Sequence, residues 1–378
     1  MGGIARWSGA AVLLLLAYLA FWPVPIEPVS WIAPENPGYT GDHVRNNGLS
    51  AIELLSIGDH LHGPEDVTRD RHGRLYVSTL EGAIVRLDPD GANPEPWADT
   101  GGRPLGIAFD PRGVLWVADA YRGLMSVTPG GKVELRSTEA DGIPIRYADD
   151  VDAAPDGLVY FTDATTRFGA EASGGTYPAS LLDIMEHRLS GRLLVYDPAR
   201  DQTRTVLSQL SFANGVAVSP DGAFLLVNET GTYRVIRYWL QGNRKGQHEV
   251  FVDQLPGFPD NISTGHQGRF WVALVSPRNA LLDRLSDKPW LRSVVQRLPG
   301  WLRPEAVPYG HIVAFDADGK VVLDLQDPAG TYPLNTSVLE TEEYLYLGSL
   351  VSPSIGRLKN PLSGAAANGH AGGRSGRR

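Results

Sequence analysis

Apolar and polar positions alternate along most of the chain in short runs that are separated by turn residues. The stretch from Phe212 to Glu229 is typical: a polar residue is followed by an alternating strand, a Ser-Pro-Asp-Gly turn and a second apolar strand. Alternation of period two around such a turn predicts a β-hairpin. The same pattern occurs five more times along the sequence.

The six hairpins share one spacing. In five of them a position at the start of the first strand lies eight residues before the turn glycine. A sixth, degenerate hairpin places Asn335 eight residues before Glu343. Six copies of one four-stranded unit predict an all-β fold, a six-bladed β-propeller over residues 49–360. The first strand of each blade lines the central axis, so these positions form a ring: Glu65, Leu105, Asp149, Asn214, Asp260 and Asn335.

The sixth hairpin is followed by only one more evident strand, near residues 354–358. An alternating segment at residues 51–57 precedes the first complete repeat. We expect this N-terminal strand to complete the sixth blade, because closure removes an exposed sheet edge.

Two long intervals between hairpins indicate insertions. Residues 164–190 contain a predicted helix at 179–188, and residues 276–310 contain a second at 288–298. The second helix has Leu291, Val294, Val295 and Leu298 on one face, and its arginines are expected on the other. It is interpreted as a helix packed on the blade rim, as a lid over the ring or, with Trp290 and Trp301, as a patch on a membrane surface.

The N-terminal residues 1–26 are predicted to be a transmembrane anchor. No residue from Trp7 to Ile26 is charged, and such a length just spans a bilayer. A cleaved signal peptide is the alternative, but no small-x-small cleavage site follows the apolar run. Arg6 precedes this segment and Glu27 follows it, which predicts a single-pass membrane protein with a cytoplasmic N-terminus and a periplasmic or extracytoplasmic propeller. Residues 27–48 are predicted to be a linker and 361–378 a disordered tail.

The composition of the chain excludes several kinds of partner and catalytic site. The formal net charge is -9 and the pI about 5.5, which argues against nucleic acid as a partner. The chain has no cysteine, so thiol nucleophiles and disulfides are excluded. We find no Gly-x-Ser-x-Gly elbow, no zinc-binding His-x-x-x-His pair and no phosphate-binding Gly-rich loop.

Five of the six ring positions offer oxygen, and three of those are carboxylates. Three like charges at one channel repel each other unless a cation lies among them. An all-oxygen ligand set favours Ca²⁺, so we predict that Glu65, Asp149, Asn214 and Asp260 bind it. Polar residues that merely cap strand ends are the alternative interpretation. A bound Ca²⁺ could polarise an ester or lactone carbonyl while Asp260 or Asp149 takes a proton from water.

At these residues the chain resembles the strictosidine synthase-like and adipocyte plasma membrane-associated protein family, within the gluconolactonase and paraoxonase group of six-bladed propellers. The resemblance covers about residues 50–360. The runs that carry it include Gly63-Pro64-Glu65-Asp66, Gly102-Arg103-Pro104-Leu105-Gly106-Ile107, Phe212-Ala213-Asn214-Gly215-Val216-Ala217 and Gly257-Phe258-Pro259-Asp260-Asn261. It implies Ca²⁺ at the ring, lactonase or arylesterase activity in hydrolytic members, and one N-terminal membrane anchor.

The chain departs from relatives at three positions. Thr336 stands where strictosidine synthase has its catalytic glutamate, and Leu105 where paraoxonases have a histidine. Asp149 stands where many relatives have asparagine, which should tighten the metal. With Asn335, Thr336 and Leu105 are predicted to contact the substrate. The sequence therefore predicts a membrane-anchored, Ca²⁺-dependent hydrolase of lactones or aryl esters; the alternative is a non-catalytic propeller that uses structural calcium and binds a partner.

Overall fold

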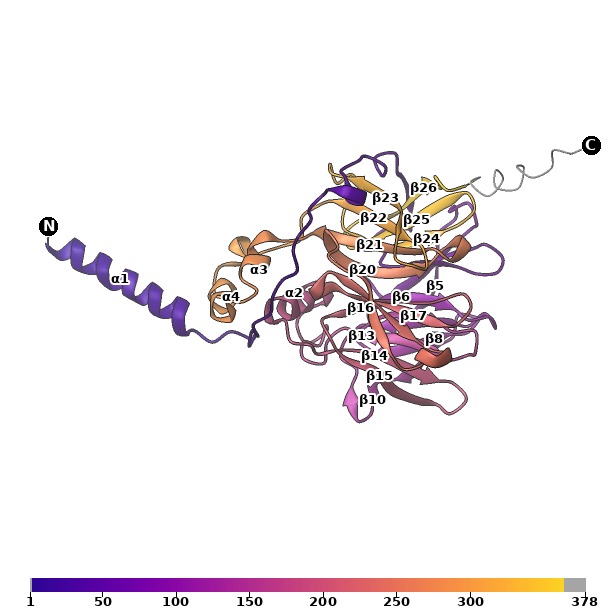
Figure 1. Cartoon of the computed structure of the whole chain (residues 1–378), viewed down its shortest axis with the longest axis horizontal. Coiled ribbons are helices and arrows are strands. Elements are labelled where there is room, and N and C mark those ends of the chain that lie inside the picture. The colour runs from indigo at the N-terminus through magenta and orange to yellow at the C-terminus, as the bar shows by residue number, and fades with distance from the viewer. Residues whose placement is uncertain (1, 364–378) are drawn as a thin grey trace, which may run out of the picture.

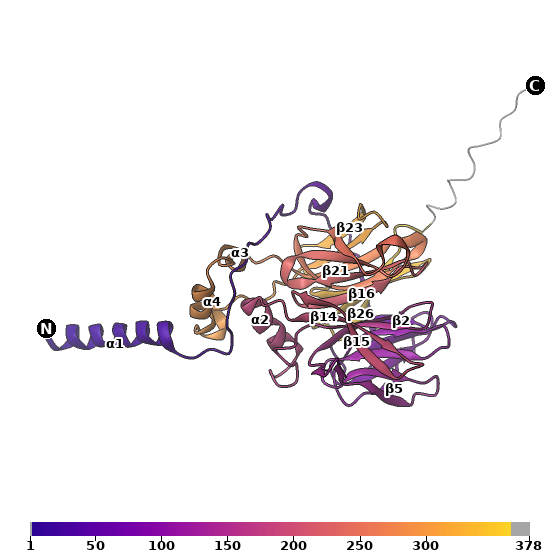
Figure 2. The same cartoon turned by 60° about the horizontal axis from the view of Figure 1, so that its bottom comes forward.

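The propeller predicted from the repeats is confirmed. The computed structural model describes residues 2–363, with side chains described from residue 7. Six four-stranded antiparallel sheets surround a central axis, and α1 projects from one side (Figure 1, Figure 2). The part of the predicted disordered tail from residue 364 onward lies outside the described residues.

Each blade is a meander in which neighbouring strands are consecutive in the chain, except where the ring closes. Blade one comprises β2 (Val67–Arg69), β3 (Leu75–Ser78), β4 (Ala83–Leu87) and β5 (Glu95–Asp99). Blade two comprises β6 (Pro104–Phe109), β7 (Leu115–Asp119), β8 (Gly123–Val127) and β9 (Val133–Ser137). Blade three comprises β12 (Ala148–Ala153), β13 (Val159–Asp163), β14 (Gly191–Asp197) and β15 (Gln202–Leu210). Blade four comprises β16 (Ala213–Val218), β17 (Phe224–Glu229), β18 (Arg234–Trp239) and β19 (His248–Val252). Blade five comprises β20 (Gly257–Thr264), β21 (Phe270–Pro277), β22 (Gly310–Phe315) and β23 (Val321–Asp327). A small ribbon, β10 (Glu139–Ala140) and β11 (Ile143–Pro144), extends from the β9–β12 connection.

The sixth blade closes the ring with the N-terminal strand, as predicted. It comprises β24 (Asn335–Glu340), β25 (Tyr344–Ser349), β26 (Ser354–Lys359) and β1 (Glu53–Ser56). β1 pairs antiparallel with β26, and Leu55 lies opposite Ile355. Ile57, just beyond the strand, is fully buried in the cluster between blades six and one.

The predicted hairpin turns depend on glycine. The five turn glycines all have positive φ, between 67° and 87°, a conformation that glycine adopts without strain. Near the axis, glycine is needed for space instead. A Cβ on Gly215 would lie 2.4 Å from the amide nitrogen of Ile262, so only glycine allows blades four and five to approach this closely.

Helices and 3-10 turns occur before the first blade and in the connections between strands. They are α1 (Gly2–Phe21), α2 (Thr176–Glu186), α3 (Ala280–Arg284), α4 (Pro289–Gln296) and the 3-10 turns η1 (Gly41–His43), η2 (Thr230–Thr232), η3 (Gly242–Arg244), η4 (His266–Gly268) and η5 (Gly300–Leu302). α2 begins three residues before the predicted start, because Pro178 is tolerated in a first helical turn, and it ends where His187 adopts positive φ. α4 confirms the second predicted helix.

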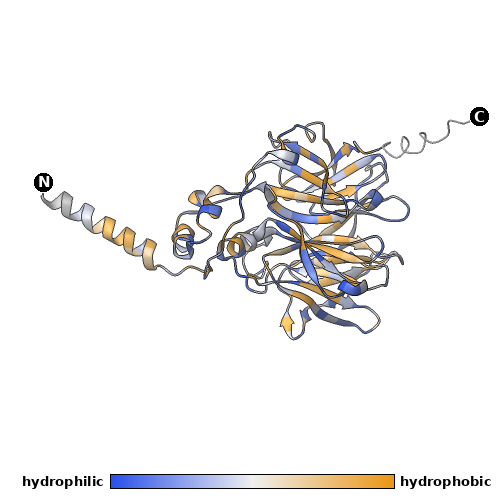
Figure 3. Ribbon diagram, in the orientation of Figure 1, coloured by the Kyte–Doolittle hydropathy of each residue, from blue (hydrophilic) through white to orange (hydrophobic). Residues whose placement is uncertain are grey.

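The described part of α1 is strongly apolar (Figure 3). Its side chains from Val12 to Leu16 are largely exposed. Among the residues that the structure describes, none of the helices is both long enough and apolar enough to cross a lipid bilayer. The predicted transmembrane helix is therefore not confirmed.

The predicted linker is packed against the propeller over much of its length. The Val29 amide donates to the Glu186 carbonyl, and the Trp31 ring stacks on His187 at 3.8 Å; Ile26, just before the linker, is 3% exposed. Further along, the Arg278 guanidinium donates to the Pro34 carbonyl at 2.6 Å. We call residues 27–48 the strap, because they hold α2, α3 and blade five together.

The expectation that the arginines of α4 face away from the packed side was wrong for Arg292. This side chain is only 1% exposed and donates to the carbonyls of Met185, at 3.0 Å, and Ser286, at 3.3 Å, and to that of Val29 in the strap. Sequence periodicity could not reveal this, because the strap covers the polar face of the helix and supplies acceptors there.

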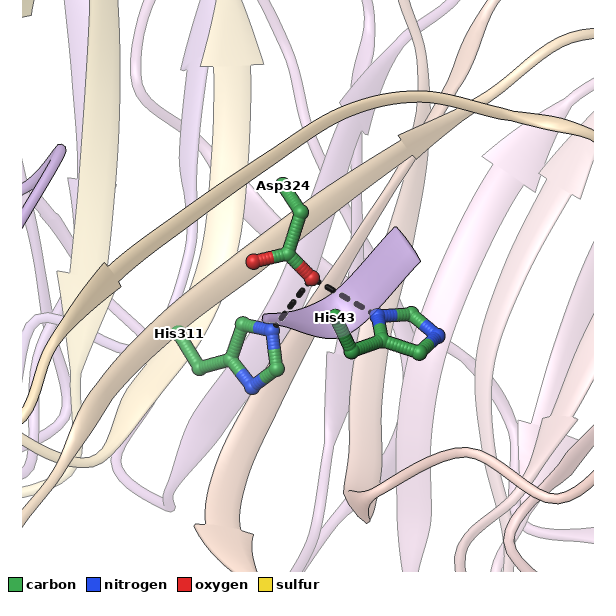
Figure 4. A group of neighbouring side chains, drawn as sticks. All are labelled: His43, His311 and Asp324. Atoms are coloured by element: carbon green, nitrogen blue, oxygen red, sulfur yellow. Dashed lines mark hydrogen bonds and ion pairs between the residues drawn. The ribbon is translucent and has the colours of Figure 1, made fainter. Parts of the chain in front are cut away.

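The strap ends in a buried hydrogen-bond cluster with blade five (Figure 4). One oxygen of Asp324 accepts from His43 of η1 at 2.7 Å and from His311 of β22 at 2.9 Å. The other oxygen accepts from Gln326 at 2.5 Å and Asn46 at 3.3 Å. Burial lowers the pKa of His311. Burial alone would raise the pKa of Asp324, but the hydrogen bonds from the two histidines and Gln326 have the larger combined effect and lower it.

Asp324→Asn should destabilise the fold by about 2 kcal/mol, because buried donors lose their shared acceptor. In the parent, stability should fall as the pH drops below about 6.5, because buried His311 resists protonation while the unfolded chain accepts the proton. It should fall further below about pH 4, where the unfolded Asp324 is protonated before the folded one. Thermal melts from about pH 8 to about pH 2, a range that spans the ordinary pKa values of both groups, test both effects. A variant with the parental melting profile would contradict them.

Candidate functional site

Five of the ring positions lie where the inner strands are irregular, and the sixth, Glu65, precedes β2. The pairing register shifts between Pro104 and Ile107, between Ala148 and Val151 and between Ala213 and Val216, and the inner strands of blades five and six have shifts at equivalent places. A β-bulge re-aims the side chains of the strand that contains it. The ring residues are thereby brought to one end of the axis although they come from different blades.

One pocket collects most of the predicted site. Its wall includes Glu65, Leu105, Asp149, Asn214 and Asp260, and the pocket with its mouth encloses about 800 Å³. All four predicted metal ligands are therefore brought together, and Leu105 lies beside them as predicted for a substrate contact.

Asn335 and Thr336 do not line this pocket. The Asn335 side chain accepts from the His311 amide at 2.8 Å and donates to the Tyr332 carbonyl at 3.1 Å. The Thr336 hydroxyl donates to the Glu65 carbonyl at 2.6 Å. Both side chains thus connect neighbouring blades, and their role in substrate binding stays a prediction.

The three ring carboxylates are buried and repel each other. Burial and the neighbouring charges of Asp260 and Glu65 raise the pKa of Asp149 well above its usual range. Burial and the charge of Glu65 do the same for Asp260, and burial raises the pKa of Glu65 to about 7. Without a counter-charge the site therefore holds protons at pH values where free carboxyls are ionised.

The donor set suits a hard divalent cation. Oδ2 of Asp149 and Oδ1 of Asn214 are buried without a hydrogen-bond partner in the described structure. The Asn214 amide nitrogen donates to Asp260 at 2.7 Å, which leaves its oxygen free for another partner. Oxygens of Glu65, Asp149 and Asp260 do not all lie within 4.8 Å of one another. Two orphaned oxygens beside two further carboxylates fit Ca²⁺, which prefers oxygen ligands in flexible geometry.

The structure adds Arg103, which the sequence reasoning had not assigned to the site. This arginine is 1% exposed, and its guanidinium donates to Glu65 at 2.9 Å and to the Gly63 carbonyl at 3.4 Å. It neutralises part of the ring charge and fixes one Glu65 oxygen. The signal was present in the Gly102-Arg103-Pro104-Leu105 run, because Arg103 lies two residues before the ring position Leu105 and alternate residues of an extended segment share a face.

Above the ring the pocket wall is apolar. Residues of α2, α3 and the segment after η5 form its outer part. The Tyr147 and Phe212 rings meet edge to face at 5.5 Å, and Phe212 holds a positive φ of 53°. Such strain in a non-glycine residue is tolerated where surrounding structure enforces it, commonly at functional sites. The apolar side chains of the wall are Leu105, Tyr147, Leu181, Ile184, Phe212, Phe258, Val275, Leu282 and Leu350.

A second set of carboxylates, one to three residues after the ring positions, serves the fold. Asp66 accepts from the Ile107 amide at 2.9 Å, and Asp150 accepts from the Val216 amide at 2.8 Å. Asp152 accepts from the Val218 amide, also at 2.8 Å. Each bond joins one blade to the next, so consecutive acidic residues divide between pocket and scaffold.

Solved structures of low sequence similarity share the architecture. A gluconolactonase from Xanthomonas campestris superposes with a TM-score of 0.60 at 18% identity, covering 89% of this chain and 99% of that one. A calcium-binding protein, regucalcin, from Agrobacterium tumefaciens gives 0.56 at 14% identity, covering 81% and 93%. At these identities the likeness concerns the fold alone.

Sequence comparisons are more specific. The family described as strictosidine synthase matches residues 149–243, and that described as strictosidine synthase-like, N-terminal, matches residues 41–87. Adipocyte plasma membrane-associated protein of Rattus norvegicus is 35% identical over 372 residues, which is 91% of this chain and 95% of the relative. Protein strictosidine synthase-like 4 of Arabidopsis thaliana is 33% identical and covers 82% of each chain. Together with the six-bladed propeller, these matches show that the chain belongs to the strictosidine synthase-like family.

Proposed function

We propose that the axial pocket is a Ca²⁺-dependent hydrolytic site for lactones or aryl esters. The observation that supports this most is the meeting of three buried carboxylates and an orphaned amide oxygen beneath an apolar wall. A bound Ca²⁺ supplies Lewis-acid polarisation of a substrate carbonyl. The names of the structural neighbours, a gluconolactonase and a calcium-binding protein, agree with this reaction class and this ion.

The residues of the chain would bind the ion, accept a proton and bind the substrate. Glu65, Asp149, Asn214 and Asp260 would hold the ion, and Arg103 positions Glu65 through its 2.9 Å hydrogen bond. Asp149 or Asp260 accepts a proton from the attacking water, a role for which a carboxylate held in a buried site is suited. The apolar wall binds the hydrocarbon part of the ester and excludes competing water.

We also propose that the N-terminal segment attaches the propeller to a membrane. Exposed apolar side chains along α1 support this, as does the membrane-associated name of the rat relative. A cytoplasmic N-terminus with the propeller on the periplasmic or extracytoplasmic side follows from the flanking charges. Flotation of the full-length chain with lipid vesicles tests the attachment.

A panel of lactones and phenyl esters tests the hydrolase. We expect turnover with added Ca²⁺ and its loss in EDTA, together with a lower melting temperature, because ion removal restores repulsion among the ring carboxylates. Mg²⁺ should restore activity poorly, since it accepts a flexible oxygen cage less readily.

The outcomes separate the hydrolase from its alternative. If EDTA lowers the melting temperature but no substrate is turned over with Ca²⁺, the ion is structural and the pocket face serves as a binding scaffold. If EDTA changes neither the melt nor the activity, the metal assignment itself is wrong.

A further inference from the structure

The four exposed tryptophans gather at one end of the molecule. Of nine tryptophans, only Trp7, Trp22, Trp290 and Trp301 are exposed, by 60% to 80% of their surface. The first two belong to α1 or follow it, and the others lie in α4 and η5. The remaining five are buried or partly buried in the propeller and strap. Exposed tryptophan is costly in water but favourable at a membrane interface, where one part of the ring is apolar and the other can hydrogen-bond.

Direct contacts fix this surface beside the end of α1. The Arg297 guanidinium, just after α4, donates to the Trp22 carbonyl at 2.5 Å and to the Leu19 carbonyl at 3.1 Å. The Tyr18 hydroxyl donates back to the Arg297 carbonyl at 3.0 Å. Both views place α3 and α4 on the side of the propeller from which α1 projects (Figure 1, Figure 2). The exposed apolar surface of α1 therefore continues onto α4 and η5.

The charge of this region is opposite to that of the whole chain. Residues 276–310 contain six arginines and lysines and three acidic residues, a local balance of +3 in a chain of -9. Arg278 and Arg292 are buried and donate to backbone carbonyls, and Arg278 also pairs with Asp283. Arg284 and Arg303 are exposed, and Arg303 lies two residues after Trp301. Basic side chains around exposed Trp and Leu are typical of surfaces that lie on anionic lipid.

We infer that α4 and η5 form a membrane-contact surface, in which Trp290, Trp301 and Leu302 enter the headgroup region of an anionic bilayer. The inference rests on the proposed membrane attachment and goes beyond it by adding a second contact, made by the propeller itself. Pro304 to Ala306, which directly follow this surface, line the pocket. The mouth of the pocket therefore opens next to the lipid headgroups.

The absence of cysteine makes the test direct, because each single-cysteine variant of the full-length chain carries one fluorescent label. Trp301→Cys and Trp290→Cys probe the surface. Leu135→Cys and Val250→Cys are matched controls, since these residues are 56% and 48% exposed on the outer strands β9 and β19. Each labelled protein is mixed with phosphatidylcholine vesicles that contain phosphatidylglycerol and nitroxide-labelled lipid, and is then floated.

Labels at 290 and 301 should be quenched by the nitroxide lipid about threefold more than the control labels, and should be shielded from aqueous iodide. Arg284→Glu with Arg303→Glu should reduce this quenching, whereas Arg71→Glu, in the hairpin turn of blade one, should not. If the protein floats but labels at 301 and 135 respond alike, the contact surface is wrong and the attachment through α1 stands. If the protein does not float, both are wrong; neither result depends on hydrolysis.

Discussion

Asp260→Asn should lower hydrolysis about 100-fold to 1,000-fold while the protein remains folded. Under the proposed function, the amide keeps the size of the side chain but removes one negative charge from the Ca²⁺ site and one candidate proton acceptor for the attacking water. Because the carboxylate of Asp260 is buried beside that of Glu65, its loss also relieves repulsion. In EDTA the variant should therefore melt at or above the temperature of the parent.

Asp152→Asn is the matched control. Asp152 is also a carboxylate of an inner strand, but it accepts from the Val218 amide and joins two blades. Its replacement should lower the melting temperature and leave the rate per folded molecule within about twofold of the parent, since a lost buried hydrogen bond affects stability. Initial rates and melts on both variants, with Ca²⁺ and with EDTA, separate the two roles. A parental rate in Asp260→Asn would refute the catalytic assignment.

Deletion of residues 49–58 should abolish cooperative folding of the whole propeller. β1 supplies the outer strand of blade six, and the deleted segment also carries Leu49 and Ile57, which are 1% and 0% exposed. Burial of such side chains contributes about 1.5–3 kcal/mol each, and the loss of both with a strand pairing approaches the whole stability of a typical domain. The expected result is a protein without a sharp thermal transition.

Deletion of residues 2–21 provides the comparison. The described side chains of α1 are mainly exposed, and its hydrogen bonds to Arg297 lie at its C-terminal end. This truncation should retain the cooperative melt within a few degrees, as measured by circular dichroism. If the chain lacking 49–58 kept an equally sharp transition, the closure would not be required for folding.

The repeat made the architecture predictable. Strand alternation, turn residues and a spacing of eight residues are local features of the sequence. Because a propeller repeats one local unit, the pattern of one hairpin was enough to locate all six. The same arithmetic placed Glu65, Asp149, Asn214 and Asp260 in one pocket, because equivalent positions of a rotationally repeated unit meet at the axis.

Local patterns were less informative where the repeat was interrupted. The helix in the second insertion was found from its apolar face, but the burial of Arg292 depends on acceptors that the strap and α2 supply. Asn335 occupies a ring position, yet its amide is held between His311 and Tyr332 by contacts that differ from those of its five equivalents.

The sequence by itself determined the blade count, the closure of the ring and the group of oxygen-bearing side chains that line the pocket, since each follows from spacing along the chain. Only the tertiary structure decided that Arg103 partners Glu65, that Asp149 faces the pocket while Asp150 joins two blades, and that the segment after α1 is a strap. These features depend on bulge geometry and on contacts such as that of His43 with Asp324, 281 residues apart. No local pattern encodes such pairs, because their free energy arises only when distant segments exclude water together.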